Sequence, residues 1–245
     1  MLTNSEIKFI KSLYLKKNRD LNSLFIVEGD KMIDELLSSD FTIENIYATK
    51  HWYDDNCPKI NDDIFVKISS KELSRISNLK SPNNVLAVVK KRDLELNHDN
   101  LTGLTLVLDS INDPGNLGTI IRSCHWFNIK NIVCSENTVD MYNSKVIQST
   151  MGSVFNVNVF YEDLSSFLKD CSNSHTIYGS FLDGDDIKNL DIKTNSILVV
   201  GNESNGISNS LVNQIHKKVT IKGISKNINS LNVASATAIM LHEIC

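Results

Sequence analysis

The first part of the chain alternates between short apolar runs and segments whose apolar residues recur at helical spacing. That spacing predicts helices over 5–17, 30–37 and 70–76. Runs rich in Val, Ile and Phe predict strands over 24–27, 43–49, 63–68 and 85–89. Ser69 and Glu72 form a capping-box pattern at the start of the third helix. The alternation predicts a small α/β unit.

The chain from residue 104 onward repeats this alternation on a larger scale. Residues 104–108 form a continuous apolar run, typical of a strand buried on both faces of a parallel sheet. The pattern predicts further strands over 131–134, 154–160, 176–180, 196–200 and 219–221, and helices up to residue 127 and over 145–150, 165–169, 211–216 and 230–243. The polar segment 92–103 interrupts it. We therefore expect a small α/β domain over 1–97 and a parallel-sheet α/β domain over 98–245.

Charge changes this picture only locally. The formal net charge of −4 disfavours nucleic-acid binding, because phosphate contacts require Lys and Arg. The basic residues nevertheless gather in two clusters, one near the start and one at Lys80 and 90–92. A solvated helix face would explain either cluster alone, whereas two clusters favour an RNA contact. The expected RNA-binding residues are Lys16, Lys17 and Arg19.

The composition indicates a cytoplasmic protein without a metal site. No apolar run approaches the roughly 20 residues that span a bilayer, and residues 1–11 lack the features of a signal peptide. The five cysteines include no CxxC pair, and their odd number argues against a disulfide framework. The six histidines show no metal-ligand pattern.

A first candidate site follows the strand at 104–108, at the end where open α/β sheets bind ligands. Pro114 and Gly115 predict a turn into a helix. A plain turn with Asn116 as the helix N-cap explains these residues but not Arg122, because a cation in an otherwise apolar helix needs a partner or a ligand. The loop is neither GxGxxG nor a P-loop, which disfavours a nicotinamide cofactor or a nucleoside triphosphate.

Two further loops have the same character. The loop 201–206 follows a predicted buried strand, and a simple role for Glu203 is to cap the next helix or offset its dipole. The segment 230–232 precedes an apolar helix, for which Ser230 or Asn229 would serve as N-cap. Loops at the ends of parallel strands converge on one edge of the sheet, which favours a shared site.

Together the three loops resemble the motifs of the SpoU, or TrmH-like, branch of the SPOUT RNA methyltransferases. The ordered set is far more specific than any single motif and covers residues 104–245. The matching residues are Asn116 and Arg122 with the lead-in 113–119 for motif 1, 201–203 and 206–208 for motif 2, and 230–233 for motif 3. The family commonly has Gly after the motif 2 glutamate, where this chain has Ser204 and Asn205. Both residues are compatible with a turn, so we expect the loop to survive.

The resemblance implies an α/β fold in which a trefoil-knotted, parallel-sheet SPOUT domain follows a small α/β substrate-binding domain. The sequence 25–29 followed by an apolar helix resembles that smaller domain. Family members act as homodimers whose sites are completed across the interface, and they hold S-adenosyl-L-methionine in the knot, largely through backbone groups. The residues expected to bind this cofactor are Ser180, Phe181, Gly201, Asn202, Gly206, Ile221, Ser230 and Leu231.

The implied reaction is methyl transfer to a ribose 2′-hydroxyl, with ribosomal RNA as the first candidate substrate and transfer RNA as the second. The expected catalytic residues are Asn116, Arg122, Glu203, Ser230 and Asn232. A guanidinium stays protonated, so we expect Arg122 to stabilise the forming alkoxide and also to contact RNA. Glu203 would orient Arg122, and the remaining three residues would place the ribose and the loop.

Three other interpretations stay open at this point. Related SPOUT branches methylate a base nitrogen instead of a ribose. A member that kept the fold but lost catalysis would be an RNA-binding module, which the intact motif residues disfavour. An unrelated α/β enzyme acting on a small metabolite is compatible with the fold class, but it leaves the basic clusters unexplained.

Overall fold

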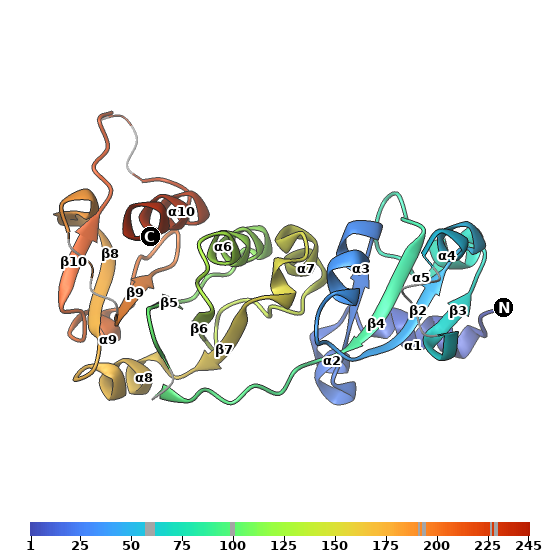
Figure 1. The fold of residues 1–245 in the computed structure, drawn as a ribbon. Helices are drawn as coiled ribbons and strands as arrows, with labels where there is room; N and C mark the ends of the chain where they lie inside the picture. Colours follow the sequence, from blue (N-terminus) through green and yellow to red (C-terminus); the bar gives the residue numbers. More distant parts are fainter. Residues whose placement is uncertain (57–61, 99–100, 191, 193–194, 226, 228–229) are drawn as a thin grey trace. The chain divides into compact units, whose positions relative to one another are not determined.

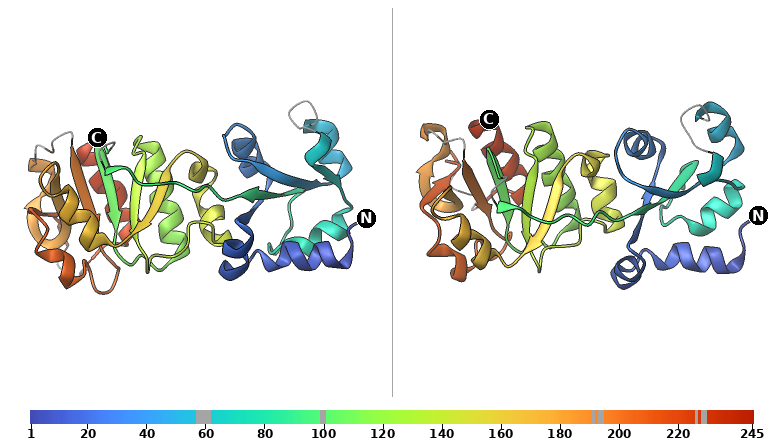
Figure 2. Two further views of the ribbon diagram at one scale, coloured as in Figure 1. Left: turned by 90° about the horizontal axis from the view of Figure 1, so that it is seen from below. Right: turned by 60° about the horizontal axis from the view of Figure 1, so that its bottom comes forward.

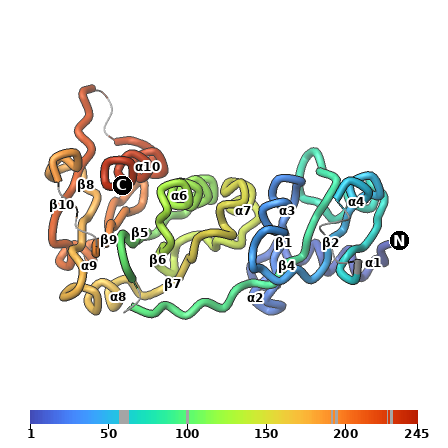
Figure 3. The backbone as a smooth tube through the Cα atoms, viewed as in Figure 1, coloured from blue at the N-terminus to red at the C-terminus, as the bar shows by residue number. Residues whose placement is uncertain are grey.

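The computed structural model describes residues 1–56, 62–98, 101–190, 192, 195–225, 227 and 230–245. Its contacts divide the chain into two compact units. The N-terminal unit comprises Met1–Asp93 and Tyr142–Phe155, and the C-terminal unit comprises Leu94–Met141 and Asn156–Cys245. Figure 3 traces the chain through both units. The domain boundary expected between residues 97 and 98 stays a prediction.

The N-terminal unit is built on a four-stranded sheet. Its strands, in spatial order, are β1 (Leu24–Glu28), β4 (Val85–Lys90), β2 (Ile43–Ala48) and β3 (Phe65–Lys67). Strand β4 is antiparallel to both β1 and β2, whereas β2 and β3 are parallel. The carboxyl ends of β1, β2 and β3 therefore lie at one edge of the sheet, which we call the carboxyl edge.

Short helices cover this sheet and differ in part from the sequence expectation. They are α1 (Asn4–Ser12), α2 (Lys16–Asn22), α3 (Asp30–Leu37), α4 (Lys50–Asn56), α5 (Ser70–Ile76) and the 3₁₀ turn η2 (Asp62–Ile64). The expected capping box of Ser69 and Glu72 is present. The helix expected over 5–17 instead ends at Ser12, because the chain turns before α2 and the Arg19 guanidinium binds the carbonyls of the turn.

The C-terminal unit contains a six-stranded, all-parallel sheet, as expected. Its strands, in spatial order, are β10 (Lys217–Thr220), β8 (Thr176–Asp186), β9 (Ser196–Val200), β5 (Leu104–Leu108), β6 (Asn131–Ser135) and β7 (Asn158–Glu162). The chain proceeds from β5 toward β7 in one direction and from β9 toward β10 in the other. Strands β5 and β9 therefore flank a topological switch point, where such sheets bind ligands.

Helices cover both faces of this sheet (Figure 1, Figure 2). On one face, α8 (Leu164–Cys171) and α9 (Asn209–Val212) pack Phe167, Leu168 and Leu211 on Val107 and Val199. On the other face, α6 (Pro114–Trp126) packs against α10 (Val233–Ile244). A 3₁₀ turn, η5 (Ile187–Asn189), follows β8. The α/β class is thus confirmed, and the trefoil knot stays a prediction.

The segment Tyr142–Phe155 folds as part of the N-terminal unit, although its sequence lies between strands of the C-terminal sheet. It contains α7 (Ser144–Thr150) and the 3₁₀ turn η4 (Ser153–Phe155). The Tyr142 ring packs on Phe25 with centroids 4.6 Å apart, and Phe155 packs on Phe41 at 5.3 Å. Each aromatic pair contributes about 1 kcal/mol beyond its buried area.

Three expected elements of the C-terminal sequence are corrected by the structure. The strand expected over 154–160 is divided, because Phe155 packs on the N-terminal unit and β7 begins only at Asn158. The helix expected over 211–216 is α9, which ends at Val212. The helix expected from residue 230 begins at Val233, where the Asn232 side chain caps it.

The part of the chain that the structure describes contains neither a membrane-spanning helix nor a metal-binding cluster. No helix there is long and apolar enough to cross a membrane. No group of His, Cys, Asp or Glu side chains there is arranged to hold a metal ion.

We predict that Gly152→Ala destabilises the N-terminal unit. Gly152 has φ +93°, and a Cβ there would lie 2.8 Å from Cβ and 2.5 Å from Cγ of Glu35. Backbone strain and overpacking together should lower the free energy of unfolding by about 2–4 kcal/mol. Gly103→Ala is the control, because Gly103 has φ +77° but open space around its Cα, so strain alone should cost about 1 kcal/mol. Equal losses in urea unfolding would contradict the prediction.

Candidate active site at the switch point

Two loops are tied together at the switch point between β5 and β9. The Asp109 amide donates to the Val200 carbonyl (2.9 Å), which continues the pairing of the two strands. The buried Asp109 carboxylate accepts hydrogen bonds from the Ser208 amide (2.7 Å) and the Ser110 hydroxyl (3.0 Å). In the other direction, the Asn202 side chain donates to the Ser110 carbonyl (2.8 Å). The loops after β5 and β9 therefore form one connected structure.

The loop 201–206 folds as a closed turn. Asn202 and Gly206 exchange two backbone hydrogen bonds of 3.0 and 2.9 Å. The Asn202 side-chain oxygen also accepts from the amides of Ser204 (2.9 Å) and Asn205 (3.2 Å). A Cβ on Gly201 would lie 2.1 Å from the Gly206 carbonyl carbon, so only glycine fits there. The loop thus survives with Ser204 after the glutamate, as expected.

A chain of side-chain hydrogen bonds joins all three sequence motifs. The Asn116 amide donates to the Glu203 carboxylate (2.6 Å), and the Asn232 amide donates to the Asn116 side-chain oxygen (2.9 Å). The Asn232 oxygen accepts from the amides of Ala234 (3.0 Å) and Ser235 (3.2 Å) at the start of α10. We call this series of hydrogen bonds the amide relay. Residues 116, 203 and 232 come from three separate segments, so the amide relay shows that the three segments converge.

Two helix caps differ from the sequence expectation. Asp113, not Asn116, caps α6, because its carboxylate accepts from the Asn116 backbone amide (2.8 Å). Asn232, not Ser230, caps α10. The other expected cap, Asn229, lies outside the described residues. The Asn116 side chain is therefore available to join Glu203 and Asn232.

Arg122 and Ser230 lie outside the amide relay. Arg122 is exposed on α6, and its guanidinium makes no hydrogen bond or ion pair with any residue that the structure describes. The expectation that Glu203 orients Arg122 is therefore not met within this chain, because Glu203 binds Asn116 instead. Ser230 is exposed in the segment before α10.

The residues expected to bind the cofactor follow three neighbouring strands. Gly179 of β8 pairs with Val199 of β9, so Ser180 and Phe181 come level with the end of β9, where Gly201 follows. Ile221 directly follows β10, the neighbour of β8. The structure thus brings Ser180, Phe181, Gly201, Asn202, Gly206 and Ile221 to the same region of the sheet.

The chemistry of this region fits S-adenosylmethionine. A nucleoside ligand requires apolar contact for its base and a few hydrogen-bonding groups for its edge and its ribose. The tight turn at Gly201 leaves no room for a Cβ, and Leu231 contributes an apolar side chain that is 50% exposed. Ser180, Ser230 and Asn232 supply small polar groups.

The first basic cluster offers less accessible positive charge than its sequence suggested. Lys16 and Lys17 are exposed on α2, as an RNA contact requires. Arg19 is buried, and its guanidinium donates to the carbonyls of Leu13 (3.1 Å) and Tyr14 (2.9 Å), so it stabilises the turn between α1 and α2. Arg19 is thus not available to RNA.

The second basic cluster is largely neutralised. Lys90 pairs with Glu44 (3.3 Å), Lys91 pairs with Asp20 (2.7 Å), and Arg92 pairs with Asp40. A pairing of this kind depends on side chains that are distant in the sequence, so the local excess of positive charge could not reveal it.

Asp109 and Ser208 tie the two loops together, although the sequence assigned neither of them a role and Ser208 entered only as part of the motif 2 match. Asp109 is the first polar residue after a continuous apolar strand, and this position was the available signal. Its partner lies 99 residues further along the chain, so only the fold reveals the contact.

The fold defines an α/β protein with a candidate ligand site at the switch point of a parallel sheet, and comparisons with known proteins specify the class further. Residues 103–242 match the model of the SpoU rRNA methylase family. Residues 4–87 match an MRM3-like substrate binding domain. The chain therefore belongs to the SpoU rRNA methylase family.

Relatives match along nearly the whole chain. The 23S rRNA (guanosine(2553)-2′-O)-methyltransferase RlmP of Bacillus subtilis is 26% identical, with 98% of this chain and 96% of that protein covered. A TrmH-family protein from Porphyromonas gingivalis is 30% identical, with a TM-score of 0.90 over 99% of this chain and 98% of that one. An AdoMet-bound rRNA methyltransferase from Sinorhizobium meliloti is 27% identical, with a TM-score of 0.88 over 99% and 95%.

We predict that Asp109→Asn loosens the switch point. An amide has one acceptor oxygen in place of two, so either the Ser208 amide or the Ser110 hydroxyl loses its partner. The free energy of unfolding should fall by about 1–3 kcal/mol. Asp113→Asn is the control, because Asp113 is exposed and Asn is an equally good N-cap, so that change should stay within about 0.5 kcal/mol. Equal stability of the two variants in urea unfolding would show that the Asp109 bonds do not hold the loops.

Proposed function

We propose that this protein uses S-adenosylmethionine to methylate a ribose 2′-hydroxyl of ribosomal RNA. The observation that carries the proposal is the amide relay, which brings the three motif segments together at the switch point. The relative RlmP is named for 2′-O-methylation of a 23S rRNA guanosine. On this ground, 23S rRNA is the first substrate to test.

The cofactor would lie against the loops that follow β8, β9 and β10. Ser180, Phe181, Gly201 and Ile221 would form the wall, with Leu231 contacting the base and backbone groups of Asn202, Gly206 and Ser230 making hydrogen bonds. When bound, S-adenosylmethionine supplies an electrophilic methyl group. The contribution of this chain is then to hold the ribose in line with that methyl group and to stabilise the oxygen that attacks it.

Arg122 is the residue assigned to stabilise the reacting oxygen. Its guanidinium stays protonated and has five N–H donors, so it can bind an alkoxide or a neighbouring phosphate but cannot accept the hydroxyl proton, which would pass to water. Asn116, Ser230 and Asn232 would place the ribose. Glu203 would act through Asn116, whose amide it already binds, and is therefore a positioning residue.

We predict that Arg122→Ala lowers kcat for methyl transfer by about 10²–10³-fold or more, because a donor to the developing charge is lost. The affinity for S-adenosylmethionine, measured by calorimetry, should stay within about twofold, because Arg122 is assigned to the acceptor ribose and not to the cofactor. Arg75→Ala is a control for the loss of one exposed arginine, since Arg75 contacts Asn4 in the N-terminal unit.

The product identifies the reaction. A 2′-O-methylated nucleoside in the digest, together with protection of one phosphodiester from alkali, is the expected result. A methylated base would contradict ribose methylation, and full activity of Arg122→Ala would contradict the assigned role.

We further propose that α6 and α10 form the interface of a homodimer. Trp126 on α6 is 84% exposed and Ile239 on α10 is 36% exposed, and the two helices pack against each other. Exposed apolar side chains on neighbouring helices favour a protein contact, and closed two-fold dimers are the commonest solution. Arg122 precedes Trp126 by four residues and so shares its helix face, which would place Arg122 beside the site of the second copy.

We predict that Trp126→Glu converts the protein to a monomer at micromolar concentration, as measured by light scattering after gel filtration. A charge in a buried interface is unfavourable without a partner, so association should weaken by at least tenfold. Leu21→Glu is the control, because Leu21 is 78% exposed on α2. An unchanged molecular mass for Trp126→Glu would exclude this interface.

A further inference from the structure

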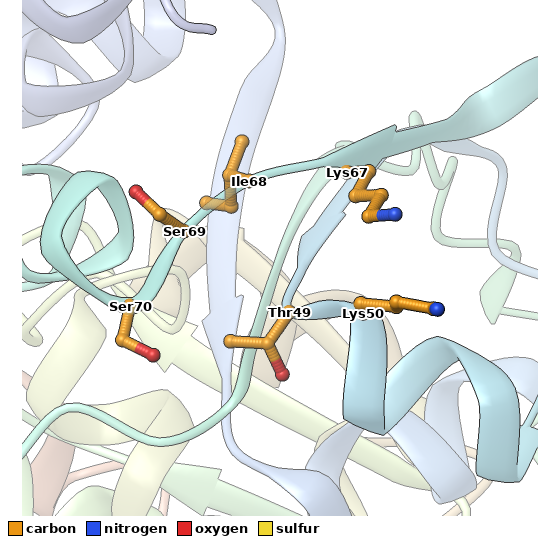
Figure 4. Close-up of a pocket in the computed structure, with 6 residues that line it drawn as sticks. All are labelled: Thr49, Lys50, Lys67, Ile68, Ser69 and Ser70. Carbon is orange, nitrogen blue, oxygen red and sulfur yellow. The ribbon is translucent and has the colours of Figure 1, made fainter.

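A pocket lies in the N-terminal unit, at the carboxyl edge of its sheet (Figure 4). Its volume is about 560 Å³, within the range of ligand-binding clefts. The residues that line it, which we call the lysine pocket, are Thr49, Lys50, Lys67, Ile68, Ser69 and Ser70. The proposed catalytic roles use none of them.

The parallel pairing of β2 and β3 creates the lysine pocket. Ala48 pairs with Lys67, so both strands end at the same level, and the Ile68 amide continues the pairing by donating to the Ala48 carbonyl (2.9 Å). Ile68 is buried. Figure 4 shows the Lys50 and Lys67 side chains extending in the same direction, with the hydroxyls of Thr49 and Ser70 elsewhere around the pocket. The backbone pairing thus brings Lys67 beside the start of α4, so that Lys50 and Lys67 line one hollow together with hydroxyl side chains.

The charge of the lysine pocket is not compensated. Both lysines are exposed, and neither forms an ion pair with any residue that the structure describes. Among the described residues that line the pocket, none is acidic. At the opposite edge of the same sheet, by contrast, Lys90 pairs with Glu44, 3.3 Å away. The two basic residues that follow Lys90 are paired as well, with Asp20 and Asp40. Positive charge without an acidic partner among the described residues is therefore present at the carboxyl edge, as it is at Lys16 and Lys17 on α2.

Two ammonium groups beside hydroxyls suit a phosphate group and its neighbouring sugar. Lysine binds phosphate as a point charge, and contacts to phosphate and sugar fix the position of a nucleic acid without reading its sequence. We propose that the lysine pocket binds the sugar–phosphate backbone of the RNA substrate; this inference rests on the proposed function for the identity of that RNA.

The test is the salt dependence of RNA binding by Lys50→Ala/Lys67→Ala. A labelled 23S rRNA fragment that the unchanged protein methylates is titrated by fluorescence anisotropy from low to moderate salt. We expect about tenfold weaker binding near 0.1 M salt and a salt slope smaller by about 2, one for each lost phosphate contact. KM for RNA should rise by a similar factor, while kcat and cofactor affinity stay unchanged. Lys50→Arg/Lys67→Arg keeps both charges and should retain the slope.

The matched control is Lys90→Ala/Lys188→Ala, which removes the same charge from two exposed lysines that already pair with Glu44 and Glu243. A slope reduced equally in this control would reflect net charge alone and would overturn the proposal. Unchanged RNA affinity in the Lys50→Ala/Lys67→Ala variant would also overturn the proposal. That holds even if the variant loses a thermal stabilisation by inorganic phosphate, because binding of free phosphate alone would not show RNA binding. Lack of methyl transfer by the unchanged protein would instead overturn the proposed function. Circular dichroism melting verifies that each variant folds.

Discussion

The register between β5 and β9 is the constraint on which the site depends. Leu108 pairs with Val200, so the loops after these strands begin at the same level. A shift of one residue would turn Asp109 away from the Ser208 amide, because successive side chains of a strand point to opposite faces. The closed turn at Gly201 and the convergence of three motif segments follow from this alignment. The buried strand pairing therefore determines the geometry of a largely exposed polar site.

Hydrogen bonds to backbone groups hold this site more than pairing of opposite charges does. Asp109 and Asn202 each bind the backbone of another segment, which fixes the two loops with short, directional contacts. Asn232 likewise joins a helix cap to the amide relay. The cation assigned to the reaction, Arg122, has no partner among the residues described. This division suits the proposed methyl transfer, because the hydrogen-bonded loops would shape the proposed cofactor site while Arg122 would remain available for RNA.

The sequence predicted those elements that depend on local physics. The strands 104–108 and 196–200 and the capping box at Ser69 required only apolar runs and near neighbours. Distant contacts decided the failures. Helix α4 has little apolar periodicity and takes its position from the sheet, with Trp52 buried. Arg19 was taken for a surface residue because its carbonyl partners arise only when the chain turns before α2. The cap at Asp113 has a local cause instead, because Pro114 occupies the first helical position and the residue before it becomes the N-cap.

The membership of Tyr142–Phe155 in the N-terminal unit has a consequence for how this protein can be divided. The unit that matches a substrate-binding domain is discontinuous in sequence. Its aromatic residues Phe25 and Phe41 are covered by rings that the methylase sequence supplies. A recombination event at the linker between the two units would therefore separate Phe25 and Phe41 from the rings that cover them. A chain that inherits this substrate-binding unit must also inherit α7 and its flanking rings, so we expect residues on the two sides of this core to have changed together.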